Sequence, residues 1–185
     1  MEGRSCQCPR IELADWRDRE VTLQGHWFLR SPTPLFLHVP RRLHQDLEAL
    51  EARIDGARYH SAGVPLVLHR DGWFAGEVLL SIEPPGQGSA PALSFQNLFY
   101  SRVVENPGFD AALRTMPGFF RDLRSARVGP IECMYFWYLN CPRCLVERGA
   151  GRIILLARSS RLLASSPYPL GAAPARGGAI LPCQP

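Results

Sequence analysis

The sequence contains no lysine and no long run of apolar residues. All 21 of its basic residues are arginine, so catalysis through a lysine Schiff base is excluded. The longest apolar stretches, 133–139 and 153–157, fall far short of the roughly 18 residues that a membrane-spanning helix needs. The first residues, Met1–Pro9, have no apolar segment after their charges, as a secretory signal would require. We therefore expect a cytoplasmic protein with no membrane partner.

Several catalytic and binding motifs are also missing. There is no Gly-x-Ser-x-Gly nucleophile turn and no glycine-rich phosphate loop, which disfavours serine hydrolases and nucleotide-dependent enzymes. The net charge is +4, but the arginines are scattered among acidic residues, and the densest basic runs are only 121–127 and 41–42. Because a nucleic-acid-binding domain normally carries a basic stripe or a known module, we expect no nucleic-acid partner.

The hydrophobic pattern describes one unit twice. A chain of 185 residues with 46% hydrophobic residues suits one compact domain. Short β-rich runs alternate with two amphipathic helices in the order strand, helix, strand, strand, and a polar connector at 84–91 separates the two copies. The first copy comprises 35–39, 43–54, 66–69 and 73–83, and the second 92–103, 106–123, 131–139 and 153–157. We predict an α+β fold with antiparallel sheets, helices on one face and a central cleft between the copies.

Two flanking segments lie outside this duplicated domain of residues 35–158. Residues 1–34 form an N-terminal segment with one strand at 20–30, which Ser31–Pro34 is expected to end. Residues 159–185 are rich in serine, proline, glycine and alanine and show no apolar periodicity. This tail is predicted to be disordered.

Three short signatures accompany the repeat: Leu37-His38-Val39-Pro40, Gly76-Glu77-Val78 and the segment 103–109. Together with the topology of residues 35–157 they resemble the GyrI-like family of small-molecule-binding domains. The resemblance implies a pseudo-twofold domain that holds a small organic molecule, often aromatic and cationic, against aromatic side chains and one buried glutamate. Some family members are hydrolases of reactive electrophilic natural products. No helix-turn-helix is expected before the domain.

Strand alternation gives a separate argument for the cleft. In 73–83, Phe74, Val78 and Leu80 share one face, which suits a core under a helix, while Trp73 and Glu77 share the other. A carboxylate among apolar groups can act as a general acid or base, or attract a cation. An ordinary glutamate paired with arginine remains the alternative.

Aromatic residues on the second copy would complete the site. Tyr135 and Trp137 share one face of their strand and are favoured over Phe136 and Tyr138. Rings at alternating positions also fill protein cores, and a ligand role becomes plausible through the opposing carboxylate. The predicted ligand-binding residues are Trp73, Glu77, Tyr100, Tyr135 and Trp137.

Three functions remain open at this point. The leading hypothesis is a small-molecule-binding protein that captures an apolar, possibly cationic ligand. The alternative is a hydrolase of an electrophilic small molecule, with Glu77 as the catalytic residue. His38 and His69 have no acidic partner nearby in the sequence, so both are expected to be hydrogen-bonded structural histidines.

A third hypothesis is an interaction module built on cysteines. Cys141 and Cys144 have the Cys-x-x-Cys spacing of a zinc knuckle, and Cys6 and Cys8 could supply two more ligands for a structural zinc ion. A redox dithiol is disfavoured because such motifs begin a helix, whereas this one is predicted in a turn between strands. The oligomeric state is not predicted.

Overall fold

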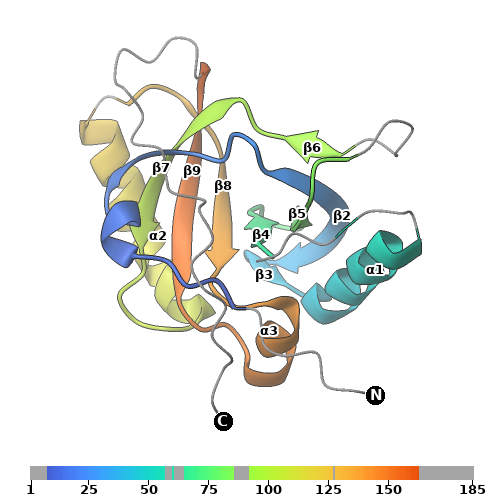
Figure 1. Ribbon diagram of the computed structural model, residues 1–185. Coiled ribbons are helices and arrows are strands. Elements are labelled where there is room, and N and C mark those ends of the chain that lie inside the picture. Colours follow the sequence, from blue (N-terminus) through green and yellow to red (C-terminus); the bar gives the residue numbers. More distant parts are fainter. Residues whose placement is uncertain (1–7, 57–59, 61–64, 86–91, 127, 163–185) are drawn as a thin grey trace.

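The computed structural model describes residues 8–56, 60, 65–85, 92–126 and 128–162 (Figure 1). These residues form a nine-stranded antiparallel sheet with three α-helices and one short 3-10 helix. The α+β prediction is confirmed. No helix among the described residues is long and apolar enough to cross a membrane. The elements are η1 Leu13–Trp16, β1 Arg19–Thr22, β2 Trp27–Phe36, β3 Val39–Pro40, α1 Leu43–Gly56, β4 Val67–Arg70, β5 Ala75–Ile82, β6 Leu93–Ser94, β7 Asn97–Val103, α2 Phe109–Ser125, β8 Ile131–Tyr138, α3 Pro142–Arg148 and β9 Ile153–Leu162.

Strand order in the sheet follows the duplication. The order β7-β9-β8-β4-β5-β2 places the first strand of each copy outermost, its third strand in the middle and its second strand innermost. The two inner strands, β8 and β4, pair antiparallel through four partners from Val67↔Tyr138 to Arg70↔Tyr135. The two copies are therefore related by an approximate twofold axis between β4 and β8.

The sheet is strongly curled. β1 and β2 lie six strands apart in the order, which in a flat sheet would separate them by about 29 Å. Only residues 23–26 connect them, a span of under about 20 Å even when fully extended. Figure 1 shows the sheet curving from β7, β9 and β8 round to β4, β5 and β2. One face of the sheet is thus turned inward.

Apolar side chains pack on both faces. The outer face carries all three helices, and its core includes Leu50 of α1, Phe119 of α2 and Leu145 of α3. The concave face is filled by a second cluster, in which the rings of Trp16, Phe28, Phe95, Phe99, Tyr135 and Trp137 are buried. In the described part of the chain, the structure therefore does not show the expected central cleft.

Several local expectations differ from the structure. The strand expected at 20–30 is divided into β1 and β2 by residues 23–26, and the strand expected at 35–39 is interrupted by a turn at Leu37 and His38. β2 runs through Pro32 and Pro34 instead of ending there, because residues 29–34 pair only with β5 and the missing N–H groups need no second partner. Residues 159–162 belong to β9, so the predicted tail begins too early, and the rest of it lies outside the described residues. Phe74 was expected in the core but is 68% exposed, since β5 begins only at Ala75.

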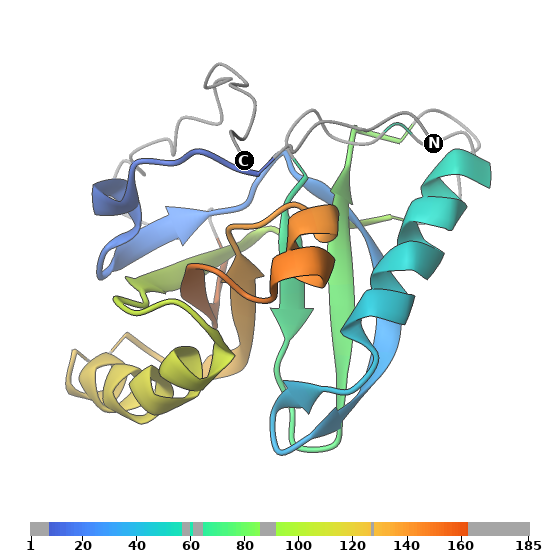
Figure 2. The same ribbon diagram turned by 90° about the horizontal axis from the view of Figure 1, so that it is seen from below.

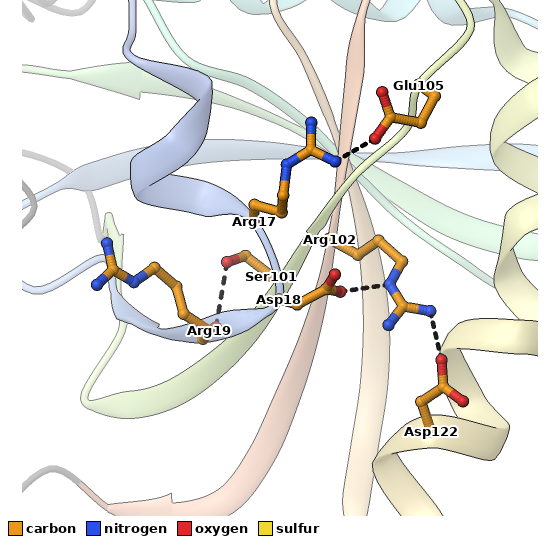
Figure 3. Close-up of polar contacts among 7 residues, drawn as sticks. All are labelled: Arg17, Asp18, Arg19, Ser101, Arg102, Glu105 and Asp122. Atoms are coloured by element: carbon orange, nitrogen blue, oxygen red, sulfur yellow. Dashed lines mark hydrogen bonds and ion pairs between the residues drawn. The ribbon is translucent and has the colours of Figure 1, made fainter.

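The N-terminal segment is fastened to the domain by polar contacts (Figure 3). Arg102 of β7 forms ion pairs with Asp18 and with Asp122 of α2, and Arg17 pairs with Glu105. These contacts lie beside the β1–β7 ladder. Residues from 8 onward in this segment are therefore part of the same folded body as the duplicated domain.

Candidate functional site

His38 and Asp71 form a histidine–carboxylate pair at one end of the sheet. His38 lies in the turn between β2 and β3, and Asp71 follows β4 directly. The Nδ1 atom of His38 is 2.8 Å from Oδ1 and 3.0 Å from Oδ2 of Asp71. The Asp71 backbone N–H donates to the Met134 carbonyl at 2.8 Å, which anchors the carboxylate to β8. His38 is thus hydrogen-bonded, as expected, and its partner is an acidic residue 33 positions away in the sequence.

The chemistry of this pair depends on which ring nitrogen of His38 is hydrogen-bonded to Asp71. With Nδ1–H donating to Asp71, the other ring nitrogen, Nε2, keeps its lone pair and can accept a proton. Burial raises the pKa of Asp71, and the hydrogen bond from His38 opposes that rise. The His38 side chain is partly exposed, at 22%. This arrangement suits a general base.

A large aromatic side chain lies beside the pair. The Trp73 ring lies 4.8 Å from the His38 ring, centroid to centroid. Trp73 was expected beside Glu77 on the open face of the sheet, but it lies at the tip of the β4–β5 hairpin and is 63% exposed. A molecule that approaches His38 therefore meets aromatic surface.

Glu77 faces the concave side of the sheet, as Leu79 does on the same strand. Its carboxylate lies between two arginines, with Oε2 3.0 Å from Arg70 Nε and Oε1 3.4 Å from Arg30 Nη1. The arginine-paired alternative describes this geometry. Both carboxylate oxygens of Glu77 are therefore engaged by guanidinium groups.

The predicted aromatic ligand residues do not converge. Tyr135 and Trp137 lie on the concave side, where the Trp16 ring meets Trp137 edge-on at 4.6 Å between centroids. Tyr100 belongs to the core under the helices, and its hydroxyl donates to Glu20 at 2.7 Å. With Trp73 at a hairpin tip, the structure does not bring the five predicted residues together in one site.

Three cysteines form a second candidate site. Cys8 of the N-terminal segment lies beside Cys141 and Cys144, with all three sulfurs within 4.8 Å of one another. The Cys8 and Cys141 sulfurs are 3.7 Å apart, and the Cys141 backbone N–H donates to the Cys8 sulfur at 3.3 Å. Cys6, the other predicted ligand, lies outside the described residues. These cysteines could bind a metal ion.

The environment of the cysteine cluster opposes ionisation of the thiols. Burial raises the pKa of Cys8, and burial, followed by hydrogen bonds that the Cys144 thiol donates to Cys8 and Cys141, raises the pKa of Cys144 to about 12. The structure also corrects one argument about this motif. Cys141 caps α3 and Cys144 lies within that helix, so the redox alternative cannot be set aside on the ground that the motif lies in a turn.

A family model described as bacterial hydrolase matches residues 2–159. The chain belongs to this bacterial hydrolase family. No curated protein and no solved structure matches the chain in the corresponding comparisons. The matched range covers the whole described N-terminal segment and both copies of the repeat. The histidine–carboxylate pair and the cysteine cluster are thus both within the hydrolase-family region.

Sequence reasoning missed Asp71 because it was assigned to a hairpin turn and lies 33 residues from His38. The residues Asp71-Gly72 are typical of a β-hairpin turn. The turn alone accounts for an aspartate at this position, so the sequence does not indicate a further role for it. A second histidine–carboxylate contact joins His44 and Glu48 on α1. It follows from their helical spacing, and both side chains are exposed. Pairing across two hairpin tips leaves no comparable signal in the sequence.

Proposed function

We propose that the protein is a hydrolase of an electrophilic small molecule, in which His38 is the general base and Asp71 orients it. The observation that carries this proposal is the contact of both Asp71 carboxylate oxygens with His38 Nδ1, at 2.8 and 3.0 Å. Membership of the bacterial hydrolase family supports the class of reaction. The duplicated topology supports a likeness to the hydrolase-like members of the GyrI-like family.

Hydrolysis of an ester illustrates the proposed chemistry. Nε2 of His38 takes a proton from water while the water oxygen bonds to the carbonyl carbon. The tetrahedral intermediate then breaks its bond to the leaving oxygen, and the proton on Nε2 passes to that oxygen. Acid and alcohol are released and His38 is neutral again. Asp71 holds the ring in the required tautomer and stabilises its transient positive charge.

The surroundings of His38 favour an apolar or aromatic substrate. Trp73 lies against the His38 ring, and Phe74 follows it on the same hairpin tip. A competing proposal keeps Glu77 as the base or as the binder of an apolar, possibly cationic ligand. It is supported less, because Arg30 and Arg70 already balance the Glu77 charge.

Activity measurements on aryl esters of increasing acyl length test the choice of base. We expect His38→Gln to lower kcat/KM by at least about 100-fold, which is typical for loss of a general base. The matched control is His44→Gln, which removes an exposed histidine from α1 and should leave the rate unchanged. Full activity in His38→Gln, or a loss in Glu77→Gln alone, would overturn the assignment.

Asp71→Asn separates orientation from folding. The amide cannot stabilise the imidazolium, so we expect kcat to fall by roughly 10-fold or more while KM changes little. The melting temperature, measured by circular dichroism, should stay close to that of the unmodified protein because the backbone bond to Met134 is retained. A change confined to KM would contradict the positioning role.

We further propose that Cys8, Cys141 and Cys144 bind a structural zinc ion. Sulfurs bound tetrahedrally at about 2.3 Å from zinc lie about 3.8 Å apart, and the Cys8 and Cys141 sulfurs are 3.7 Å apart. A disulfide would need sulfurs about 2.05 Å apart. The N–H bond from Cys141 to the Cys8 sulfur is the kind of contact that supports a zinc thiolate.

Metal analysis of the purified protein tests the zinc proposal. We expect about one zinc ion per chain, lost in Cys141→Ser/Cys144→Ser together with a lower melting temperature. Cys133→Ser is the control, because Cys133 lies on β8 outside the cluster. Zinc retention in the double variant would refute the site, and reversible dithiol oxidation without metal would identify a redox pair instead. Cys6→Ser tests whether Cys6 supplies the fourth ligand.

A further inference from the structure

Two neighbouring hairpin tips carry one exposed apolar surface. The surface, called here the tip surface, consists of Phe36, Leu37, Val39, Trp73 and Phe74. The β2–β3 and β4–β5 hairpins end side by side in Figure 2, and the Leu35 backbone N–H donates to the Phe74 carbonyl at 2.9 Å. The five side chains therefore belong to one region of the molecule.

This concentration of apolar groups departs from an ordinary protein surface. Single exposed hydrophobic residues are common, whereas a contiguous group marks a contact with another molecule. Among the described residues, five of the six large hydrophobic side chains that are most exposed form the tip surface, at 40–68% exposure, and Val146 on α3 is the sixth. The exposed apolar residues are thus gathered at one place.

The backbone holds the outermost residue of this surface in an unfavourable conformation. Phe36 pairs with Val39, so Leu37 and His38 form a two-residue turn, with φ angles of +48° and +75°. Turns of this kind favour asparagine and glycine, because other side chains are strained at positive φ. Leu37 occupies a position where asparagine or glycine would be less strained, and the His38–Asp71 bond connects the turn to the neighbouring hairpin.

The charges around the tip surface are positive on balance. Arg41 lies over the Phe36 ring at 5.9 Å, and the exposed Arg42, next in the chain, donates from Nε to Gln45 Oε1 at 2.9 Å. The nearest described carboxylates on these hairpins are already engaged, Asp71 with His38 and Glu77 with two arginines. Aromatic and aliphatic side chains next to arginines are the combination that binds the interface of an anionic membrane.

The edge of the sheet offers little to a protein partner. β3 is the last strand in the order and has only two residues, Val39 and Pro40. Beside it, β2 residues 29–34 pair only with β5 and form the rest of this edge. Pro32, Pro34 and Pro40 have no backbone N–H to donate, so strand addition along this edge would gain few hydrogen bonds. Side-chain insertion into a lipid surface needs no such pairing.

We propose that the tip surface docks on an anionic lipid bilayer, with its five apolar side chains in the headgroup region and Arg41 and Arg42 against lipid phosphates. This proposal does not rest on the hydrolase activity. It revises the expectation that the protein has no membrane partner. Where both hold, His38 lies at the bilayer surface and meets substrates dissolved in the lipid.

Vesicle flotation with the full chain tests the docking. We expect binding to vesicles of phosphatidylcholine with phosphatidylglycerol at least about 10-fold tighter than to phosphatidylcholine alone, and weaker binding at high salt. Trp73→Ala/Phe74→Ala should lower the affinity at least about 10-fold, and Arg41→Gln/Arg42→Gln should remove the preference for phosphatidylglycerol. Val146→Ala, the exposed apolar residue outside the tip surface, should bind normally.

Leu37→Asn keeps the test independent of folding. Asparagine suits the positive φ of this turn, so the melting temperature should hold or rise while vesicle binding falls. Normal binding by this variant and by Trp73→Ala/Phe74→Ala would overturn the proposal. Absence of vesicle binding, together with dimers in light scattering that disappear in Trp73→Ala/Phe74→Ala, would also overturn it and assign the tip surface to self-association.

Discussion

Trp16→Ala should lower the free energy of unfolding by about 3–5 kcal/mol, the usual cost of removing a large buried aromatic side chain. Trp16 lies before the first strand, in a segment that the sequence separates from the duplicated domain, yet only 8% of it is exposed. Its ring meets Trp137 edge-on in the middle of the concave cluster. Alanine would leave a cavity there that the curled sheet cannot easily close.

Urea unfolding followed by circular dichroism measures this effect. Trp73→Ala is the matched control, since it removes the same side chain from an exposed position and should change stability by no more than about 0.5 kcal/mol. Equal stability of the two variants would mean that residues 8–18 do not close the concave side. It would also reopen the expectation of an accessible cleft on that face.

The fold could be predicted from local patterns because each copy repeats them. Helical spacing of Leu47, Leu50 and Ile54 gave the buried face of α1, and alternation in 73–83 separated Val78 and Leu80 from Leu79. The curl of the sheet was not predictable in the same way. It depends on β1 joining the far end of the sheet through β7, a long-range pairing that strand periodicity does not encode.

The two candidate sites also differ in whether a local sequence motif indicates them. The Cys-x-x-Cys spacing is a local signal, and it led to Cys8 as well because cysteine pairs are conspicuous in the sequence. The His38–Asp71 pair depends on two hairpin tips meeting, and aspartate before glycine is expected in any such turn. A cleft was expected because the concave face was treated as open, whereas Trp16 and Phe95 fill it.

His69→Phe should remove a large part of the loss of stability in acid. His69 is fully buried on β4 beside the rings of Phe109 and Phe136, with centroids 6.2 and 5.4 Å away. Neither of its ring nitrogens has a hydrogen-bond partner within the described residues, so the expectation that His69 is hydrogen-bonded is wrong. Burial, and secondly the charge of His38, lower the pKa of His69 to about 3, so the folded protein keeps this ring neutral.

The sign of the pH dependence follows from this lowered pKa. The unfolded chain binds a proton at His69 below its ordinary pKa of about 6.5, whereas the folded protein does not until about pH 3. The stability that the neutral His69 contributes is fully present above about pH 6.5. It is lost as the pH falls from about 6.5 to about 3, at about 1.4 kcal/mol per pH unit and on the order of 4–5 kcal/mol in all.

Urea unfolding at a series of pH values between 7 and about 4 isolates this contribution as the difference in slope between the unmodified protein and His69→Phe. His26, whose pKa burial also lowers, adds a slope of the same sign that both proteins share. His69→Leu serves as a second variant, because a misfit of phenylalanine would shift stability equally at every pH and leave the slope unchanged. Parallel curves for all three proteins would show that His69 is protonated in the folded state or that the ring reaches water.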